Sequence, residues 1–241
     1  MENYHKFPLK RKPECADCST EERLAILEEE HRLLRHDKAV LLWEKRRLRR
    51  ELEMDELTGL RNARSFEKKC LETMARVEKK REASFSSKDD HISRRQKNPH
   101  AVAFVDLDGL QWTNNHPEFG YIIGDRILIA LANILNRWRR QDDLVVRRSG
   151  DEFLLLFPGS SKKEAERLLL ENRRRFERVI EKRFPGLIGK VSFSFGAHEV
   201  NLKNSEKEIT LALESAGKDM HYWKERRKMD RSVSSLSGDA A

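Results

Sequence analysis

Arg147-Arg148-Ser149-Gly150-Asp151-Glu152-Phe153 places two adjacent carboxylates in a short polar segment between two apolar runs, residues 144–146 and 153–157. Two such runs joined by a Ser-Gly-Asp segment predict a β-hairpin. Its turn then carries Asp151 and Glu152. Because their charges repel each other in a tight turn, we expect a cation to compensate them.

A second acidic site, Asp106-Leu107-Asp108, follows the apolar run 101–105. This run predicts a strand that is buried on both faces. A helical crossover from that strand to the hairpin makes the two neighbours, so the acids at their ends should lie together. Oxygen ligands from two strands suit Mg²⁺, and two adjoining carboxylate sites are typical of two-metal phosphoryl transfer. Taken singly, each Asp is more simply explained as a cap or a surface residue.

The order of patterns from residue 101 onward predicts the fold class. After the strand at 101–105 we expect a loop at 112–120, an apolar-faced helix at 127–138, the hairpin at 143–157, a charged helix at 160–184, an alternating strand with one buried face at 191–195 and a last helix at 205–228. These assignments follow from helical and strand periodicity. They give an α+β, ferredoxin-like βαββαβ domain with an added helix.

Asn114 and Asp125 suggest a purine-binding site beside the acids. An Asp carboxylate accepts two hydrogen bonds from the N1–H and N2–H₂ edge of guanine, and Asn can bind its O6 or N3. Adenine lacks this donor edge, so the pair favours a guanine nucleotide.

Five motifs occur in a specific order: Asp55-x-Leu57-Thr58-Gly59-Leu60-x-Asn62, Asp106-Leu107-Asp108, Asn114-Asn115, Gly124-Asp125 and the hairpin stretch. Together they resemble the GGDEF domain of diguanylate cyclases, over roughly residues 55–228. The resemblance implies a nucleotidyl-cyclase-like palm domain. It also implies the condensation of two GTP into cyclic di-GMP and two pyrophosphates at the interface of a dimer.

The resemblance implies a role for each matching position. Asp106 and Asp151 would hold Mg²⁺, or Mn²⁺ in its place, assisted by the carbonyl of Leu107. Asp151 and Glu152 would be the catalytic acids, with Asp151 the candidate acceptor of the 3′-hydroxyl proton. The implied GTP-binding residues are Asn114 and Asp125 at guanine, Ser149 and Gly150 in the turn, and Lys224 and Lys228 at the phosphates.

Arg140-Gln141-Asp142-Asp143 resembles the family's inhibitory Arg-x-x-Asp site, at the usual distance before the hairpin turn. Arginine can clamp guanine and phosphate through two parallel hydrogen bonds, so Arg140 and Asp143 are candidates for binding the product. The plain alternative is a surface ion pair.

The sequence departs from the family pattern in several places. Ser149 replaces the first Gly of the signature, which matters mainly if the backbone φ is positive there, and we expect reduced rather than abolished turnover. The loop at 116–119 is two residues longer than usual. The last helix differs from the family at positions 217, 219 and 221 and lacks the closing Gly-Arg-Asn.

Four segments are expected along the chain. Residues 1–19 form a flexible segment, 20–54 a helix, 55–228 the GGDEF domain with a flexible insertion at 83–100, and 229–241 a disordered tail. Leu27, Leu34, Leu41 and Leu48 recur every seven residues in the helix, which is typical of the d positions of a two-stranded coiled coil. We therefore expect a homodimer. The alternative is an amphipathic helix packed on its own domain.

Cys15 and Cys18 form a lone Cys-x-x-Cys, which is at most half of a Zn²⁺ site, and free thiols are the simpler explanation. The absence of a long apolar run or an N-terminal signal predicts a cytoplasmic protein that does not enter a membrane. The net charge of +8 suits anionic partners, although each basic cluster taken alone is better explained as a solvated helix face. We expect nucleotides rather than nucleic acid.

Two functions are compatible with these features. The first is an active diguanylate cyclase that is dimerised by its helix and inhibited by its product. The second is a weak or inactive GGDEF protein that acts as a receptor or scaffold for cyclic di-GMP or GTP. The retained acids Asp106, Asp151 and Glu152 favour the enzyme.

Overall fold

The computed structural model describes residues 19–64, 66–84, 99–200 and 206–238, and the side chains of 49–50, 84 and 228–238 are outside this description. The chain divides into two compact units, Met1–Leu52 and Glu53–Ala241. The described ranges do not include the Cys-x-x-Cys motif at Cys15 and Cys18, most of the expected insertion or the last three residues. No helix within those ranges has the length and apolarity needed to cross a membrane.

Helix α1, Thr20–Glu53, confirms the long N-terminal helix that the sequence predicts. Ser19 and Glu22 form a reciprocal cap at its start, because each backbone N–H donates to the other's side chain. The leucines of the heptad pattern are all more than half exposed: Leu24, Leu27, Leu34, Leu41, Leu48 and Leu52. A single chain thus leaves the heptad stripe open to solvent.

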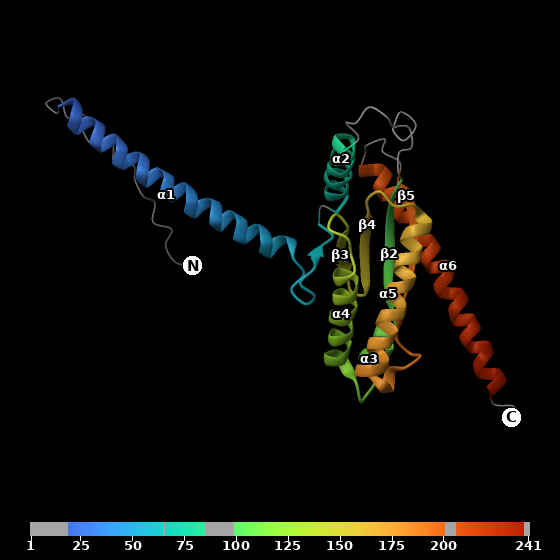
Figure 1. Ribbon diagram of the computed structural model, residues 1–241. Coiled ribbons are helices and arrows are strands. Elements are labelled where there is room, and N and C mark those ends of the chain that lie inside the picture. The colour runs from blue at the N-terminus through green and yellow to red at the C-terminus, as the bar shows by residue number, and fades with distance from the viewer. Residues whose placement is uncertain (1–18, 65, 85–98, 201–205, 239–241) are drawn as a thin grey trace. The chain divides into compact units, whose positions relative to one another are not determined.

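The second unit is built on a five-stranded sheet (Figure 1). Its strands in spatial order are β1 (Arg61–Asn62), β3 (Leu144–Ser149), β4 (Glu152–Phe157), β2 (His100–Asp108) and β5 (Ser192–Val200). The inner strand β2 pairs antiparallel with both β4 and β5. The four longer strands have the expected ferredoxin-like arrangement, and the short β1 adds a parallel edge that the sequence did not predict.

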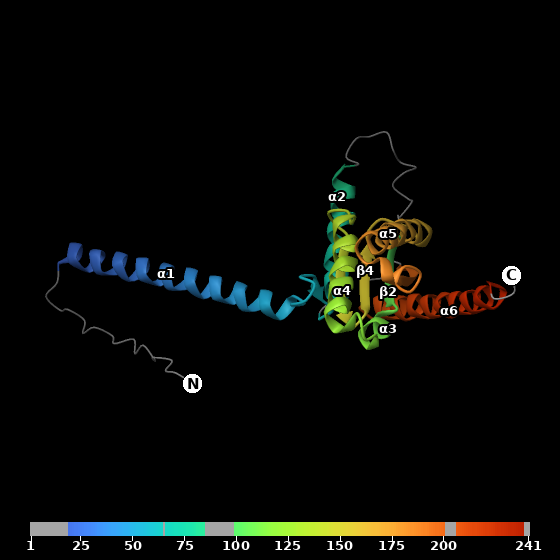
Figure 2. The ribbon, with the colours of Figure 1, turned by 90° about the horizontal axis from the view of Figure 1, so that it is seen from below.

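Helices cover both faces of this sheet (Figure 2). On one face, Ala103, Val105 and Leu107 of β2 join the core under α4 (Gly120–Arg137) and α5 (Lys162–Arg183). On the other face, Val102 and Phe104 join the core under α2 (Phe66–Ser84) and α6 (Glu206–Gly238). The continuous apolar run of β2 is explained because both of its faces are buried.

Three local predictions need correction. Residues Leu110–Asn115 form helix α3 inside the region expected to be a loop, and Thr113 Oγ1 donates to the Gly109 carbonyl at its start. Ser192 and Ser194 of β5 are buried, although the alternation predicted one buried face, because their hydroxyls donate to the carboxylates of Glu177 and Asp108. The backbone of α6 extends to Gly238, beyond the end expected near residue 228.

Candidate active site

The two acidic sites lie together at one end of β2. Asp106 is the register partner of Glu152, the first residue of β4. Next to this pair, the backbone N–H of Leu107 donates to the Asp151 carbonyl at 3.0 Å. The negative charges of Asp151 and Asp108 both raise the pKa of Asp106, although burial is the larger cause of the raised pKa.

The hairpin turn accommodates serine at the first signature position. Gly150 carries the positive φ of 48°, whereas Ser149 is the last residue of β3 and is the register partner of Glu152. The pairing of β3 with β4 is irregular between Arg147 and Ser149, and the glycine-favouring positive φ of the turn falls on Gly150. The Ser149 hydroxyl donates to Glu152 Oε2 at 3.1 Å, and Arg148 Nη1 lies 3.4 Å from the same oxygen.

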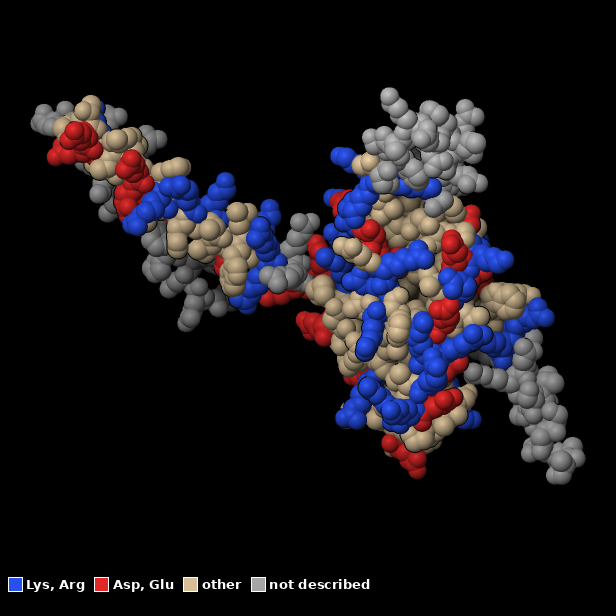
Figure 3. Space-filling model, in the orientation of Figure 1, with Lys and Arg blue, Asp and Glu red and all other residues tan. Residues whose placement is uncertain are grey.

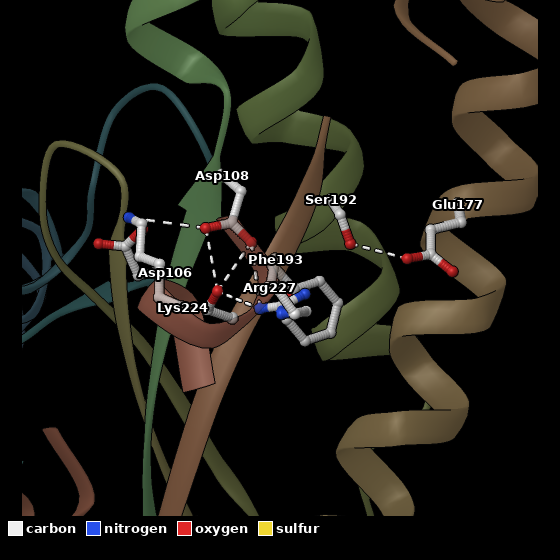
Figure 4. A network of polar contacts seen from close by, with 8 residues as sticks. Asp106, Asp108, Glu177, Ser192, Phe193, Lys224 and Arg227 are labelled. Carbon is white, nitrogen blue, oxygen red and sulfur yellow. Dashed lines mark hydrogen bonds and ion pairs between the residues drawn. The ribbon is translucent and has the colours of Figure 1, made fainter. Parts of the chain in front are cut away.

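Lys224 of α6 points into the acidic site (Figure 4). Its ammonium group contacts Asp106 Oδ1 and lies 3.6 Å from Asp108 Oδ1. Burial disfavours the charged form of Lys224, but the hydrogen bond to Asp106 and the surrounding carboxylates outweigh it and raise the pKa of Lys224. A fixed positive charge therefore already lies against a carboxylate that the sequence assigns to a metal.

Asp108, Ser194 and Arg227 extend this network. The sequence placed Asp108 in the acidic site but did not predict the involvement of Ser194 and Arg227. Asp108 accepts hydrogen bonds from the Ser194 hydroxyl at 2.8–2.9 Å and from Arg227 Nη2 at 3.3 Å. Arg227 also donates to Ser194 Oγ and to the Phe193 carbonyl. These residues come from β2, β5 and α6, so no local sequence pattern links them.

Asn114 and Asp125 are brought near each other by α3 and α4. Asn114 Oδ1 is buried and has no hydrogen-bond partner in the described part of the chain. It packs against Gly124, where the Cβ of any larger residue would lie only 2.0 Å from Asn114 Oδ1. The neighbouring Asp125 is exposed. A buried acceptor without a partner costs free energy, so Asn114 is poised to accept a hydrogen bond from a ligand.

Arg147 joins the hairpin turn to the segment between α1 and β1. Its Nη1 donates to Asp55 Oδ1 at 3.0 Å, and its Nη2 donates to the Gly150 carbonyl at 2.7 Å. Asp55 also accepts from the backbone N–H of Thr58. Burial raises the pKa of Asp55, but the hydrogen bonds from Thr58 and Arg147 outweigh burial, so the pKa is lowered overall.

Arg140 and Asp143 shape the turn before β3. The Asp143 carboxylate is buried and accepts the Arg140 backbone N–H at 2.7 Å. Burial raises the pKa of Asp143 despite that hydrogen bond. The Arg140 guanidinium donates to Ser160 Oγ at 3.1 Å. Asp143 thus stabilises the turn, and Arg140 is the more exposed of the two.

The donor set for a metal is small. Within the described ranges, no three His, Cys, Asp or Glu side chains are grouped so as to hold a metal ion by themselves. Asp106 and Asp151 nevertheless lie close enough to influence each other, and Asp106 already binds a cationic group. Mg²⁺ sites commonly use one or two carboxylates and complete their shell with phosphate and water, so these residues fit that ion. The side chain of Lys228 is outside the described part.

The sheet has the α+β, ferredoxin-like arrangement that the sequence predicts, with carboxylates at the end of its inner strand β2. Residues 52–230 match the family model described as the GGDEF domain of diguanylate cyclases, and the chain belongs to this family. The match confirms the family that the sequence motifs predicted.

Curated relatives match over shorter segments. Diguanylate cyclase DgcP of Pseudomonas aeruginosa is 38% identical over 73 residues, which is 30% of this chain and 10% of DgcP. Probable diguanylate cyclase DgcE of Escherichia coli is 33% identical over 119 residues, which is 48% of this chain and 9% of DgcE. The matched segments thus span about a tenth of these relatives.

Solved structures support the fold. The coiled coil and GGDEF domain of Caulobacter crescentus DgcB, solved with c-di-GMP, aligns with a TM-score of 0.57 at 20% identity, covering 86% of this chain and 95% of that chain. Pseudomonas aeruginosa SiaD, solved with its activator SiaC, aligns with a TM-score of 0.52 at 23% identity, covering 84% and 74%.

Proposed function

We propose that this protein is a diguanylate cyclase, which condenses two GTP into cyclic di-GMP and two pyrophosphates. The observation that carries the proposal is the register of β2 with the hairpin, which sets Asp106 beside Glu152 and ties Leu107 to Asp151. The positive φ of the turn falls on Gly150 and Ser149 lies in β3, so this departure from the family signature is compatible with turnover.

Within this proposal each group has a distinct task. Asp106 and Asp151, with the Leu107 carbonyl, hold Mg²⁺ or Mn²⁺, which supplies charge neutralisation at the phosphates. Asp151 accepts the proton of the 3′-hydroxyl, and Glu152 is kept in place by Ser149 and Arg148. Asp125 accepts hydrogen bonds from the guanine N1–H and N2–H₂ edge, and Asn114 accepts from N2–H₂ through Oδ1 while its amide N–H donates to N3. Lys224 and Lys228 bind the phosphates.

The condensation needs two nucleotides, so we further propose that α1 forms a homodimer. Each domain presents one GTP, and each 3′-hydroxyl attacks the α-phosphate held by the other domain. The exposed heptad leucines of α1 support this assembly, because pairing two helices would bury them. Joining two domains raises the effective concentration of each for the other.

Product inhibition is proposed at Arg140. Arg140 is an exposed residue, whereas Asp143 is buried in the turn and maintains the backbone that presents Arg140. Cyclic di-GMP would be clamped by the guanidinium through its guanine and phosphate groups.

The decisive test is turnover of GTP with Mg²⁺ by the purified chain. We expect cyclic di-GMP from the native protein and a loss of about 10²-fold or more in rate with Asp151→Asn. Glu181→Gln, which neutralises an exposed acid on α5, is the control and should retain full activity.

A folded dimer that makes no product would contradict the proposal. If that protein still bound cyclic di-GMP, and Arg140→Ala abolished the binding in calorimetry, the receptor function would replace it.

A further inference from the structure

A cavity lies between α5, the edge strand β5 and α6, and it shares Arg227 with the network of the acidic site. Its volume is about 650 Å³, within the range of small-molecule sites. The residues that define it are Arg167, Leu170 and Arg173 of α5, Phe195 of β5, and Trp223 and Arg227 of α6. Lys and Arg side chains are frequent over α5 in the space-filling view (Figure 3). We call this cavity the α5–α6 groove.

Arg173 is the group in the groove that most needs a partner. Its guanidinium lies over the ring of Phe195, 5.4 Å from the centroid, and the structure records no ion pair for it within the described residues. Burial and the neighbouring charge of Arg227 lower the pKa of Arg173. The acids that act on Arg173 are Glu177 and Asp108, and each is already hydrogen-bonded to a serine of β5.

The guanidinium of Arg227 is also only partly hydrogen-bonded. Its Nη2 group is engaged by Asp108 and Ser194, but its Nε is buried and has no hydrogen-bond partner in the described part of the chain. The positive charges of Arg173 and Arg227 therefore repel each other in a partly buried groove. The carboxylates near Arg173 are hydrogen-bonded to other residues. An anion between the two guanidinium groups would relieve this repulsion and supply charge-assisted hydrogen bonds.

The remaining walls suit a flat ring. Trp223 is 52% exposed, and Phe195 is half-buried beneath Arg173. The acids at the mouth of the groove are occupied elsewhere. Glu164 caps α5 through Ser161, and Glu166 lies 3.9 Å from Lys162.

We propose that the α5–α6 groove binds a small organic anion that carries a planar aromatic ring, of about the size of a nucleoside monophosphate. The anion binds between Arg173 and Arg227, and the ring lies against Trp223. The proposal concerns binding alone and stands whether or not the chain makes cyclic di-GMP.

The test uses AMP as the probe, because adenine lacks the donor edge that suits Asn114 and Asp125. The four tryptophans give four indole N–H signals in a ¹⁵N–¹H spectrum, and Trp223→Phe identifies that of Trp223. We expect AMP to shift the Trp223 signal saturably. Adenosine, which lacks the anion, and inorganic phosphate, which lacks the ring, should each bind at least about tenfold more weakly.

Two variants separate a site from general electrostatic attraction. Arg173→Gln should weaken AMP binding about tenfold or more. Arg174→Gln makes the same change at the next residue, which is exposed, and should leave the affinity unchanged. Thermal midpoints of both variants check that the fold is intact.

Three outcomes would overturn the proposal. The first is no saturable shift of Trp223 at millimolar AMP. The second is a shift centred on Trp112, which lies on α3 beside the acidic site. The third is equal weakening by the two arginine variants.

Discussion

Gly124 shows how a single hydrogen atom in place of a methyl group sets the geometry of the candidate guanine site. The residue lies in α4, and the absence of a Cβ leaves room for Asn114 Oδ1. Another glycine within an α-helix, Gly217 of α6, would place a Cβ 3.8 Å from Phe104, which is an ordinary contact. The two positions therefore provide a matched pair.

We predict that Gly124→Ala displaces the Asn114 side chain and raises KM for GTP about tenfold, with a smaller effect on kcat. Gly217→Ala should leave KM unchanged and stabilise the fold by up to about 1 kcal/mol, because alanine favours the helix. Steady-state kinetics and urea denaturation of both variants provide the measurements. Equal KM values in the two variants would exclude the proposed role of Asn114.

His100 at the start of β2 predicts a pH dependence of stability. The residue is 1% exposed, and its Nδ1 accepts the Gly159 backbone N–H at 3.1 Å, so this nitrogen must be unprotonated. Burial lowers the pKa of His100 from 6.5 and outweighs Glu78 on α2, which raises it, while Arg81 adds to the lowering.

Because the folded pKa lies below the unfolded value, the contribution of His100 is complete above pH 6.5 and is lost as pH falls toward the folded pKa. We expect the free energy of unfolding to decrease in that window. In His100→Asn the amide oxygen replaces Nδ1 as acceptor, and this part of the pH dependence should disappear. Denaturant titrations at several pH values would show it, and an unchanged profile would refute the assignment.

At the scale of elements, the segment between α1 and β1 is held to the hairpin by Arg147. The Arg147 side chain is 11% exposed and that of Asp55 is 24% exposed, so their ion pair is shielded from solvent. The pair between Arg167 and Glu171 on α5 is much more exposed, at 63% and 35%. Exposed pairs contribute little, whereas shielded and hydrogen-bonded ones are strongly coupled.

We predict that a double-mutant cycle of Asp55→Asn and Arg147→Lys gives a coupling energy of about 1–3 kcal/mol in unfolding free energy. The same cycle on Glu171→Gln and Arg167→Lys should give less than about 0.5 kcal/mol. Arg147→Lys should also lower the rate of GTP turnover, because lysine cannot contact Asp55 and the Gly150 carbonyl with one planar group. Similar coupling energies in the two cycles would show that Arg147 acts only as a surface charge.

For the whole molecule, the proposed dimer depends on how apolar residues are arranged on α1. The d-position leucines form one exposed stripe, and Ile26, Leu33 and Val40, which also recur every seven residues, form a second one outside the heptad seam. A two-stranded coiled coil buries only the a and d positions. The neighbours Leu34 and Leu33 therefore distinguish the two stripes.

We predict that Leu34→Glu converts the dimer into monomers and reduces turnover at low protein concentration, with activity restored at high concentration. Leu33→Glu, the same substitution at an outer position, should remain dimeric. Sedimentation velocity and rate against protein concentration measure both effects. Dissociation of both variants would mean that the interface is wider than a two-stranded seam.

The sequence predicted the parts of this protein that depend on local patterns. The apolar run before Asp106, the turn chemistry around Gly150 and the periodicity of α1 each involve residues within a few positions of one another. Helix α3 was not predicted because its short, mostly polar sequence has no helical repeat of apolar residues. Strand β1 was not predicted because its two residues are too few to form a pattern. Arg227 and Ser194 were missed because their contact joins α6 to β5, and only the folded chain brings them together.

The single guanidinium of Arg147 couples the segment at Asp55 to the hairpin turn at Gly150. It binds Asp55, two residues after the end of α1 in the chain, and the Gly150 carbonyl in the turn. Because the guanidinium is rigid and planar, a shift toward Asp55 also changes its hydrogen bond to the Gly150 carbonyl. Free-energy coupling between two sites is reciprocal, so a disturbance at residue 55 that alters the turn implies an equal effect in reverse. Under this coupling, occupancy of the turn would change the hold of Arg147 on the segment after α1 as much as a change in that segment would affect the turn.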